Sequence, residues 1–306
     1  MQGKMKLKLI QAKEKQRTIK SGFTFKGFSL FSGQDVEMVC QPANEDMGII
    51  FRYKGQDIPA VAENVKLMDV HTTALTKNGV DVVTIEHLMA AIWGLGIDNI
   101  RLTLSDSVVP ARDGSAEAFT KAFQKNGVIE QSKQRKVIQV KKEFTILQPE
   151  YENRSAKFEL SNNLGIDSSA PFPFPIGEHT VSFDGNPDTF VKEFSWARTF
   201  LRSPIELDDL AKWNGIRSVF KALPEDPRKS PIITFTEKEF LTKLKKEDEP
   251  ARHKMLDLIG DLALVGYRIN TRLIINEPGH KFTHLIASEI RNALNLKLDG
   301  KQEKIP

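Results

Sequence analysis

The sequence contains a single cysteine and has almost no net charge. The first property argues against a disulfide-stabilised protein, and the second against a nucleic-acid-binding protein. Cys40 is the single cysteine among 306 residues, so no internal disulfide can form, which fits a reducing compartment. Lys plus Arg exceeds Asp plus Glu by only 44 − 40 = 4, too little to indicate a nucleic-acid-binding protein. We therefore expect no nucleic-acid partner and a cytoplasmic location.

Long apolar runs are lacking as well. No segment reaches the roughly 18 uninterrupted apolar residues that a membrane-spanning helix needs, so we expect no integral membrane segment. Residues 1–15, MQGKMKLKLIQAKEK, are rich in lysine and do not contain the apolar core of a secretory signal. We predict that they form a flexible basic tail.

The remaining composition is that of a folded protein. Hydrophobic residues make up 40% and charged residues 27%, and the length suits two domains of ordinary size. In each half, strand patterns cluster before helical patterns instead of alternating with them, which favours the α+β class. The basic, polar stretch 130–136 predicts a boundary, and we expect similar-sized domains over 16–132 and 133–306, each a sheet layered with helices.

One predicted helix, RHKMLDLIGDLALVG over 252–266, carries polar groups in an apolar setting. His253, Asp257 and Asp261 follow one another at steps of four, so at ~100° per residue all three occupy one side of the helix. A solvated stripe is the alternative interpretation, but the neighbouring residues are apolar almost all round. Because burying an unpaired carboxylate is costly, buried charges are normally paired or bound to a metal.

A histidine and an aspartate at this spacing can bind one cation, and zinc in catalytic sites takes three protein ligands and a water. His87, in TIEHLMAA, is the best third ligand because it also lies in an apolar helical run, beside Glu86. We predict Thr84 as the N-cap of that helix, whose first turn would keep His87 neutral. Glu86 could then accept a proton from the water. Spacing alone leaves open the alternative of two unrelated buried histidines.

Five segments together carry a family resemblance: TIEHLMAA, VPARDGSAEAF, SWARTF, ARHKMLDLIGDL and PGH. Their order and spacing resemble those of the UDP-3-O-acyl-N-acetylglucosamine deacetylases, the zinc amidases of lipid A synthesis in Gram-negative bacteria. The likeness extends from Gln16 to the last predicted helix. It implies removal of acetate from a UDP-linked acylated amino sugar, Zn²⁺ as cofactor, and an active site between two domains. We expect the chain to be a monomer.

The resemblance also implies residue roles. The zinc ligands would be His87, His253 and Asp257. Glu86 would activate the attacking water, and His280, in PGH, would assist departure of the amine. Asp261 would orient and charge that histidine, which accounts for the third polar residue on the helix.

The remaining implied roles concern the substrate. Thr199, in ARTF, matches a hydroxyl that helps to hold the tetrahedral oxyanion. Lys254 matches a lysine near the substrate, and Phe200 could pack against the sugar.

Segments expected to contact the substrate depart from the family pattern. Phe31, in SLFSG, stands where a histidine is usual, and Thr283 where an asparagine is usual. The stretch around Gly215 has one glycine where the family is glycine-rich, and Leu201 and Arg202 replace a small residue and an aromatic one. Two alternatives therefore stay open: a divergent paralogue acting on another N-acetylated sugar, or a catalytically weak binding or regulatory protein of the same fold.

Overall fold

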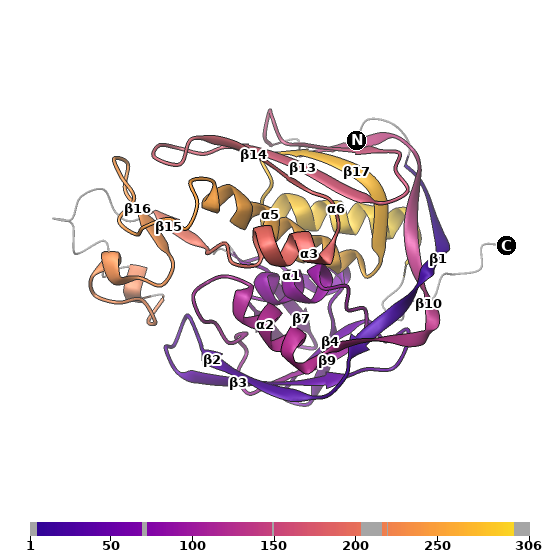
Figure 1. Cartoon of the computed structure of the whole chain (residues 1–306), viewed down its shortest axis with the longest axis horizontal. Helices are drawn as coiled ribbons and strands as arrows, with labels where there is room; N and C mark the ends of the chain where they lie inside the picture. The colour runs from indigo at the N-terminus through magenta and orange to yellow at the C-terminus, as the bar shows by residue number, and fades with distance from the viewer. Residues whose placement is uncertain (1–4, 69–71, 149, 203–215, 219, 297–306) are drawn as a thin grey trace.

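The computed structural model describes residues 5–68, 72–148, 150–202, 216–218 and 220–296 (Figure 1). Two sheets form the outer layers of the molecule, and the main helices lie between them (Figure 1). Strands and helices are mixed without regular alternation, which confirms the α+β class. Among the described residues, no helix combines the length and hydrophobicity needed to span a bilayer.

The N-terminal half builds a five-stranded sheet. In spatial order its strands are β2 (Phe23–Phe28), β3 (Asp35–Pro42), β9 (Ile100–Leu104), β4 (Ile49–Tyr53) and β5 (Gln56–Pro59). Alternation along β3 buries Val36, Met38 and Cys40, so one face of the sheet lines the core. The predicted burial of the Cys40 thiol is confirmed, and burial raises its pKa to about 12.

Smaller elements complete this half. A 3₁₀ turn (Ala62–Asn64) leads into a three-stranded sheet of β6 (Val65–Lys66), β7 (Ala74–Lys77) and β8 (Val80–Val83). Its two helices are α1 (Glu86–Gly94) and α2 (Glu117–Asn126), and they lie on the inner side of the five-stranded sheet (Figure 1).

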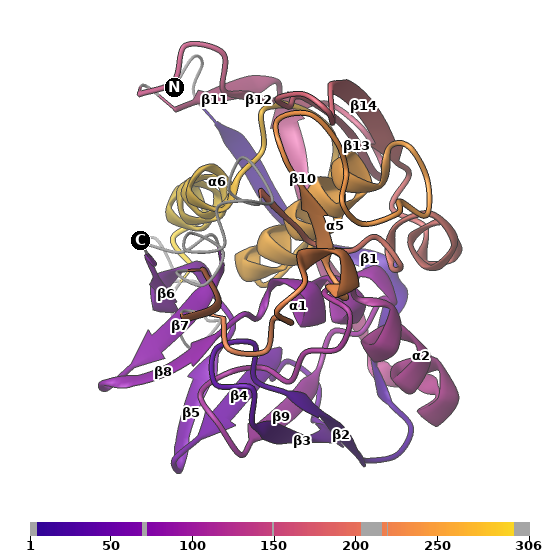
Figure 2. The same cartoon turned by 90° about the vertical axis from the view of Figure 1, so that its left-hand side faces the viewer.

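The second sheet has seven strands, drawn from the N-terminal segment and from the chain after residue 127. Its strand β17 (Arg268–Asn276) pairs with three others. Its members are β1 (Lys6–Ile19), β10 (Val128–Lys142), β11 (Phe144–Leu147), β12 (Ser155–Glu159), β13 (Leu164–Pro171), β14 (Glu178–Phe183) and β17. Helices α5 (Glu249–Leu262) and α6 (His280–Ala293) cover its inner face (Figures 1 and 2).

Short elements connect these. Helix α3 (Pro187–Thr189) continues into a π-helical turn (Phe190–Phe194), and a small sheet pairs β15 (Phe200–Arg202) with β16 (Ile233–Phe235). Single 3₁₀ turns follow at Pro227–Lys229 and Ala263–Val265.

The prediction of a flexible tail over residues 1–15 is wrong for residues 6–15. They form most of β1, which pairs along nearly its whole length with β10 and makes the long ribbon at one side of the molecule (Figure 1). The lysines of this segment alternate with Leu7 and Leu9, which are partly buried against the core. This period of two is a strand pattern, and the lysines occupy its solvent side.

The predicted domain boundary at 130–136 does not lie in a linker. These residues belong to β10, and its pairing with β1 runs through them with register shifts near Lys15. Their side chains are exposed or half-buried, which explains the loop-like composition of an outer strand. The division of the chain into two domains therefore stays a prediction.

The two halves meet where α1 crosses α5 (Figure 2). A β-carbon added at Gly260 would lie 2.1 Å from the carbonyl oxygen of Glu86 and 3.1 Å from the amide nitrogen of Ala90. The helix backbones are thus in direct contact at this point, which only glycine permits. The crossing holds the first turn of α1 against the middle of α5.

We expect Gly260→Ala to destabilise the protein by at least about 1–3 kcal/mol, because the added methyl group overlaps a backbone atom. Gly165→Ala is the matched control, since no atom lies within 4 Å of the added methyl group and its φ is not positive. Urea unfolding monitored by circular dichroism compares the two variants. Equal unfolding midpoints for Gly260→Ala and wild type would show that the helices are not in backbone contact.

Candidate metal and catalytic site

The first turn of α1 begins differently from the prediction. Thr84 has φ 61°, a left-handed backbone that threonine rarely adopts, and its hydroxyl has no partner among the described residues. It therefore does not cap the helix, which starts after Ile85 without a side-chain cap. His87 still lies in the first turn, near the positive end of the helix.

The structure brings His87, His253 and Asp257 together. The Nε2 atoms of His87 and His253 lie 3.4 and 3.3 Å from Oδ1 of Asp257. One potential ligand atom from each residue falls within 4.8 Å of the others. The three side chains come from two helices, α1 and α5, and converge on one point. In the sequence, His87 and Asp257 are 257 − 87 = 170 residues apart.

This cluster fits a divalent metal ion. Oδ1 of Asp257 is buried and has no hydrogen-bond partner in the described part of the chain. Nδ1 of His253 contacts the carbonyl oxygen of Ala197 at 3.0 Å, so this nitrogen carries the donated proton and Nε2 presents a lone pair. Burial lowers the pKa of His253 to about 3, which keeps its ring neutral. Two imidazole nitrogens and a carboxylate oxygen are a donor set that zinc accepts.

A second cluster, Asp261, His280 and His284, has metal-ligand residue types at similar separations but differs chemically. Oδ2 of Asp261 contacts Nδ1 of His280 at 2.8 Å and the Thr283 hydroxyl at 2.5 Å. Its Oδ1 accepts from the Thr73 hydroxyl at 2.7 Å. Because both carboxylate oxygens are already hydrogen-bonded, this cluster resembles a proton-handling network more than a metal site.

Electrostatic interactions give Asp261 and His280 opposite charges. Burial alone would lower the pKa of His280, but the charge of Asp261 and the hydrogen bond to it raise this pKa to about 9. Burial would likewise raise the pKa of Asp261, but the charge of His280 and the hydrogen bonds to this carboxylate overcome that effect and lower the pKa. At neutral pH, His280 is therefore a cation beside a carboxylate anion.

Glu86 lies at the start of α1, with only 3% of its surface exposed. Its carboxylate accepts hydrogen bonds from the Thr72 hydroxyl at 2.9 Å and from the Thr73 amide at 3.0 Å. Since the Thr73 hydroxyl donates to Asp261, the dipeptide Thr72–Thr73 contacts both the Glu86 carboxylate and the cluster of Asp261, His280 and His284.

Sequence reasoning did not identify Thr72 and Thr73. Their signal in the sequence was the pair of adjacent hydroxyl residues in DVHTTAL.

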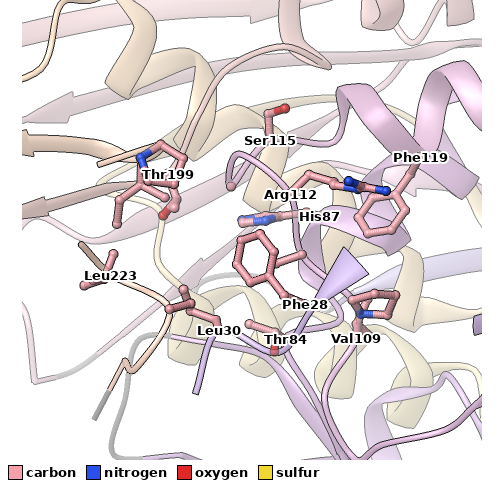
Figure 3. A pocket seen from close by; sticks show the side chains of 16 residues that line it. Phe28, Leu30, Thr84, His87, Val109, Arg112, Ser115, Phe119, Thr199 and Leu223 are labelled. Carbon is pink, nitrogen blue, oxygen red and sulfur yellow. The ribbon is translucent and has the colours of Figure 1, made fainter. Parts of the chain in front are cut away.

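The three residues with substrate roles implied by resemblance lie beside the metal cluster. Nζ of Lys254 contacts Oδ2 of Asp257 at 2.8 Å and lies 5.3 Å from the Phe200 ring centroid. The Phe200 ring lies 6.1 Å from that of His253. Thr199 and His87 line one small pocket, with Thr199 and Leu223 on one side of the His87 ring (Figure 3).

A buried ion pair fixes the chain segment that orients His253. The Arg198 guanidinium bonds Glu249 with both Nε, at 2.8 Å, and an Nη, at 3.0 Å, and Glu249 is fully buried at the start of α5. Ala197, whose carbonyl accepts from His253, directly precedes Arg198. The pair therefore ties this carbonyl to the helix that carries the histidine.

Two of the segments that depart from the family pattern contact each other. The Phe31 ring lies 5.4 Å from that of Phe220, and the amide of Ala222 donates to the carbonyl of Leu30 at 3.3 Å. Phe31 is thus half-buried against another aromatic side chain, where a histidine would bring a polar group. Gly215 lies outside the described residues.

A buried two-histidine, one-carboxylate cluster, flanked by a carboxylate and an imidazolium, defines the class of metal-dependent hydrolases. The comparisons with known proteins narrow the class to a family. A family model described as "LpxC: UDP-3-O-acyl N-acetylglycosamine deacetylase" matches residues 16–292. The chain belongs to this family, and it is a deacetylase by membership.

Similar curated proteins carry the same name, "UDP-3-O-acyl-N-acetylglucosamine deacetylase". One from Hahella chejuensis is 36% identical over 94% of this chain and 92% of its own length. One from Marinobacter nauticus is 35% identical over 90% of both chains, and one from Helicobacter hepaticus is 33% identical over 90% of both.

We expect His253→Ala to lose zinc. Replacing partners of metal ligands typically lowers affinity by about 10–100-fold, so removing a ligand should lower it further. The measurement is zinc per chain by atomic emission after dialysis against a weak chelator. His179→Ala is the control, because His179 lies in β14 and outside the cluster. Equal zinc content in the two variants would contradict the ligand assignment.

Proposed function

We propose that this protein removes acetate from UDP-3-O-acyl-N-acetylglucosamine in lipid A biosynthesis, using Zn²⁺. The observation that carries the proposal is the buried Asp257 oxygen without a hydrogen-bond partner, facing two imidazole nitrogens, with an acid and a base on either side. The names of the relatives supply the substrate. A nucleotide-linked substrate and a single buried cysteine support a cytoplasmic location.

His87, His253 and Asp257 would hold the ion. Bound there, zinc acts as a Lewis acid toward the acetamide carbonyl and promotes ionisation of water. The hydrogen bond from His253 to Ala197 holds that ring in the tautomer whose Nε2 can coordinate. Lys254 donates to the other oxygen of Asp257 and keeps the carboxylate oriented.

Glu86 accepts the proton of the attacking water. Its two oxygens are held by Thr72 and Thr73, so the carboxylate is positioned before substrate binds. As the water adds to the carbonyl carbon, negative charge develops on the carbonyl oxygen, and the Thr199 hydroxyl donates a hydrogen bond to it.

His280 donates a proton to the leaving nitrogen. The carbon–nitrogen bond then breaks, giving acetate and the free glucosamine amine. The neighbouring carboxylate of Asp261 keeps the ring protonated at neutral pH and fixes its Nδ1 side, which leaves Nε2 free for the transfer. Phe200 and Lys254, beside the cluster, would contact the sugar.

The deciding experiment compares the wild-type protein with Glu86→Gln in acetate release from UDP-3-O-acyl-N-acetylglucosamine. We expect turnover by the wild type and a loss of about 10²–10⁴-fold in the variant, because the general base is removed while the metal ligands stay. Zinc content is measured in parallel and should not change. A zinc-loaded wild type without turnover on this or any other acetylated amino sugar would favour a binding protein.

The pH profile tests His280. Its pKa is raised to about 9 in the folded protein, so the acid is protonated below that value and loses its proton above it. We expect kcat/KM to fall above pH about 9 and, in Asp261→Asn, to fall at lower pH, since the charge that raises this pKa is removed. An unchanged alkaline limb in Asp261→Asn would show that another group titrates there.

A further inference from the structure

His284 lies one turn beyond His280 on the same side of α6, and the proposed reaction does not use it. Its residue surface is 6% exposed, and its ring lies 6.1 Å from that of His280 at an interplanar angle of 29°. Nε2 of His284 contacts the Thr73 hydroxyl at 3.0 Å and lies 3.5 Å from Oδ1 of Asp261. Its Nδ1 is buried and without a hydrogen-bond partner among the described residues.

The Thr73 hydroxyl is the centre of this network and has a single proton to give. It lies 2.7 Å from Oδ1 of Asp261, 3.1 Å from Nδ1 of His280 and 3.0 Å from Nε2 of His284. The Asp261 carboxylate can only accept, so the hydroxyl satisfies it by donating its proton in that direction. The oxygen can then accept from one of the two histidines.

Counting protons settles which histidine donates to Thr73. Nδ1 of His280 is closer to Asp261, at 2.8 Å, and its proton goes there. If His284 carries its proton on Nε2, it donates to the Thr73 hydroxyl. The Thr73 hydroxyl and both oxygens of Asp261 then all have hydrogen-bond partners. If His284 carries the proton on Nδ1, a buried donor is left without a partner, and Nε2 competes with Asp261 for the one hydroxyl proton. Leaving a buried donor without a partner is costly, so the Nε2 tautomer is preferred.

We propose that His284 is a positioning residue for the reaction: by donating from Nε2 to Thr73, it directs the hydroxyl proton of Thr73 to Asp261. The Asp261 carboxylate is then held on both oxygens, and its Oδ2 stays aligned with Nδ1 of His280. His284 acts through two neighbours and does not touch the reacting atoms. The inference rests on the proposed function, in which His280 is the acid.

The same chain of contacts extends to the other side of the site. The backbone amide of Thr73 donates to Glu86, while the Thr73 hydroxyl serves Asp261. By holding the Thr73 hydroxyl, His284 therefore also restrains Thr73, whose amide positions the proposed base Glu86. Loss of the Nε2 donor should lower kcat more than it changes KM, because substrate contacts are untouched.

The test compares His284→Gln with His284→Leu. Glutamine can place an N–H near the position of Nε2, whereas leucine fills a similar volume without a donor. We expect kcat to fall on the order of tenfold or more in the leucine variant, which is about 1.4 kcal/mol or more, and to stay within about threefold of wild type in the glutamine variant. KM and zinc content should be unchanged in both. Equal kcat values for the two variants would overturn the proposal.

A double-mutant cycle with Thr73→Val adds a second criterion. Valine keeps the branched shape of threonine and removes the hydroxyl through which His284 is proposed to act. We expect Thr73→Val/His284→Leu to be no slower than Thr73→Val alone, since the two changes remove one interaction. Additive losses would mean that His284 acts by another route and would contradict the proposal.

Nitrogen NMR of histidine side chains separates this proposal from the proposed function. In zinc-loaded wild-type protein, the spectrum should show His284 with its proton on Nε2, and in His284→Leu the Nδ1–H signal of His280 should shift. A proton on Nδ1 of His284 would overturn the proposal whether or not the protein is a deacetylase. Absent turnover in the wild type, with both NMR results as expected, would overturn the proposed function and leave the hydrogen-bonded arrangement of His284, Thr73 and Asp261 standing.

Discussion

The contact between the backbones of α1 and α5 at Gly260 sets the distance on which the site depends. Side chains usually keep packed helices 8–10 Å apart, and here one helix presents no side chain at the point of crossing. The carbonyl of Glu86 occupies the space that a β-carbon would fill. Because metal ligands must agree in position to a few tenths of an ångström, a wider crossing would separate the proposed ligand His87 from His253 and Asp257.

The second constraint is electrostatic, and it separates two aspartates four residues apart on one helix. Asp257 keeps one buried oxygen without a partner, while both oxygens of Asp261 are hydrogen-bonded. A buried carboxylate that is fully hydrogen-bonded can serve as the counter-ion of His280, whereas Asp257 keeps one oxygen that can still bind a metal ion. Identical side chains thus acquire different roles from their neighbours alone.

Two short segments outside the helices, 72–73 and 197–198, contact the groups that we propose to react. The Thr72–Thr73 dipeptide bonds Glu86 and Asp261, and the buried Arg198–Glu249 pair fixes the carbonyl that sets the His253 tautomer. The left-handed backbone at Thr84 turns the chain into α1 without a cap, a strained conformation of the kind that collects at functional sites. These contacts hold the side chains of the site in place in the structure without a ligand.

Much of the site was determined by the sequence through local periodicity. The step of four placed His253, Asp257 and Asp261 on one side of a helix, and apolar neighbours implied that they are buried. The α+β class followed from the clustering of strand and helix patterns. Lysines concealed the period of two in residues 6–15, so β1 was missed, and the strand pairing of 130–136 was hidden by its polar composition.

Only the tertiary structure decided which distant groups meet. The Thr73 hydroxyl contacts Asp261, 188 residues away in the sequence, and His284, 211 residues away. No sequence pattern of hydroxyl residues predicts such distant partners. The same holds for Gly260, whose role becomes visible only when another backbone lies against it. Periodicity and burial are local properties that a sequence displays directly, whereas hydrogen bonds between remote segments depend on how the whole core packs.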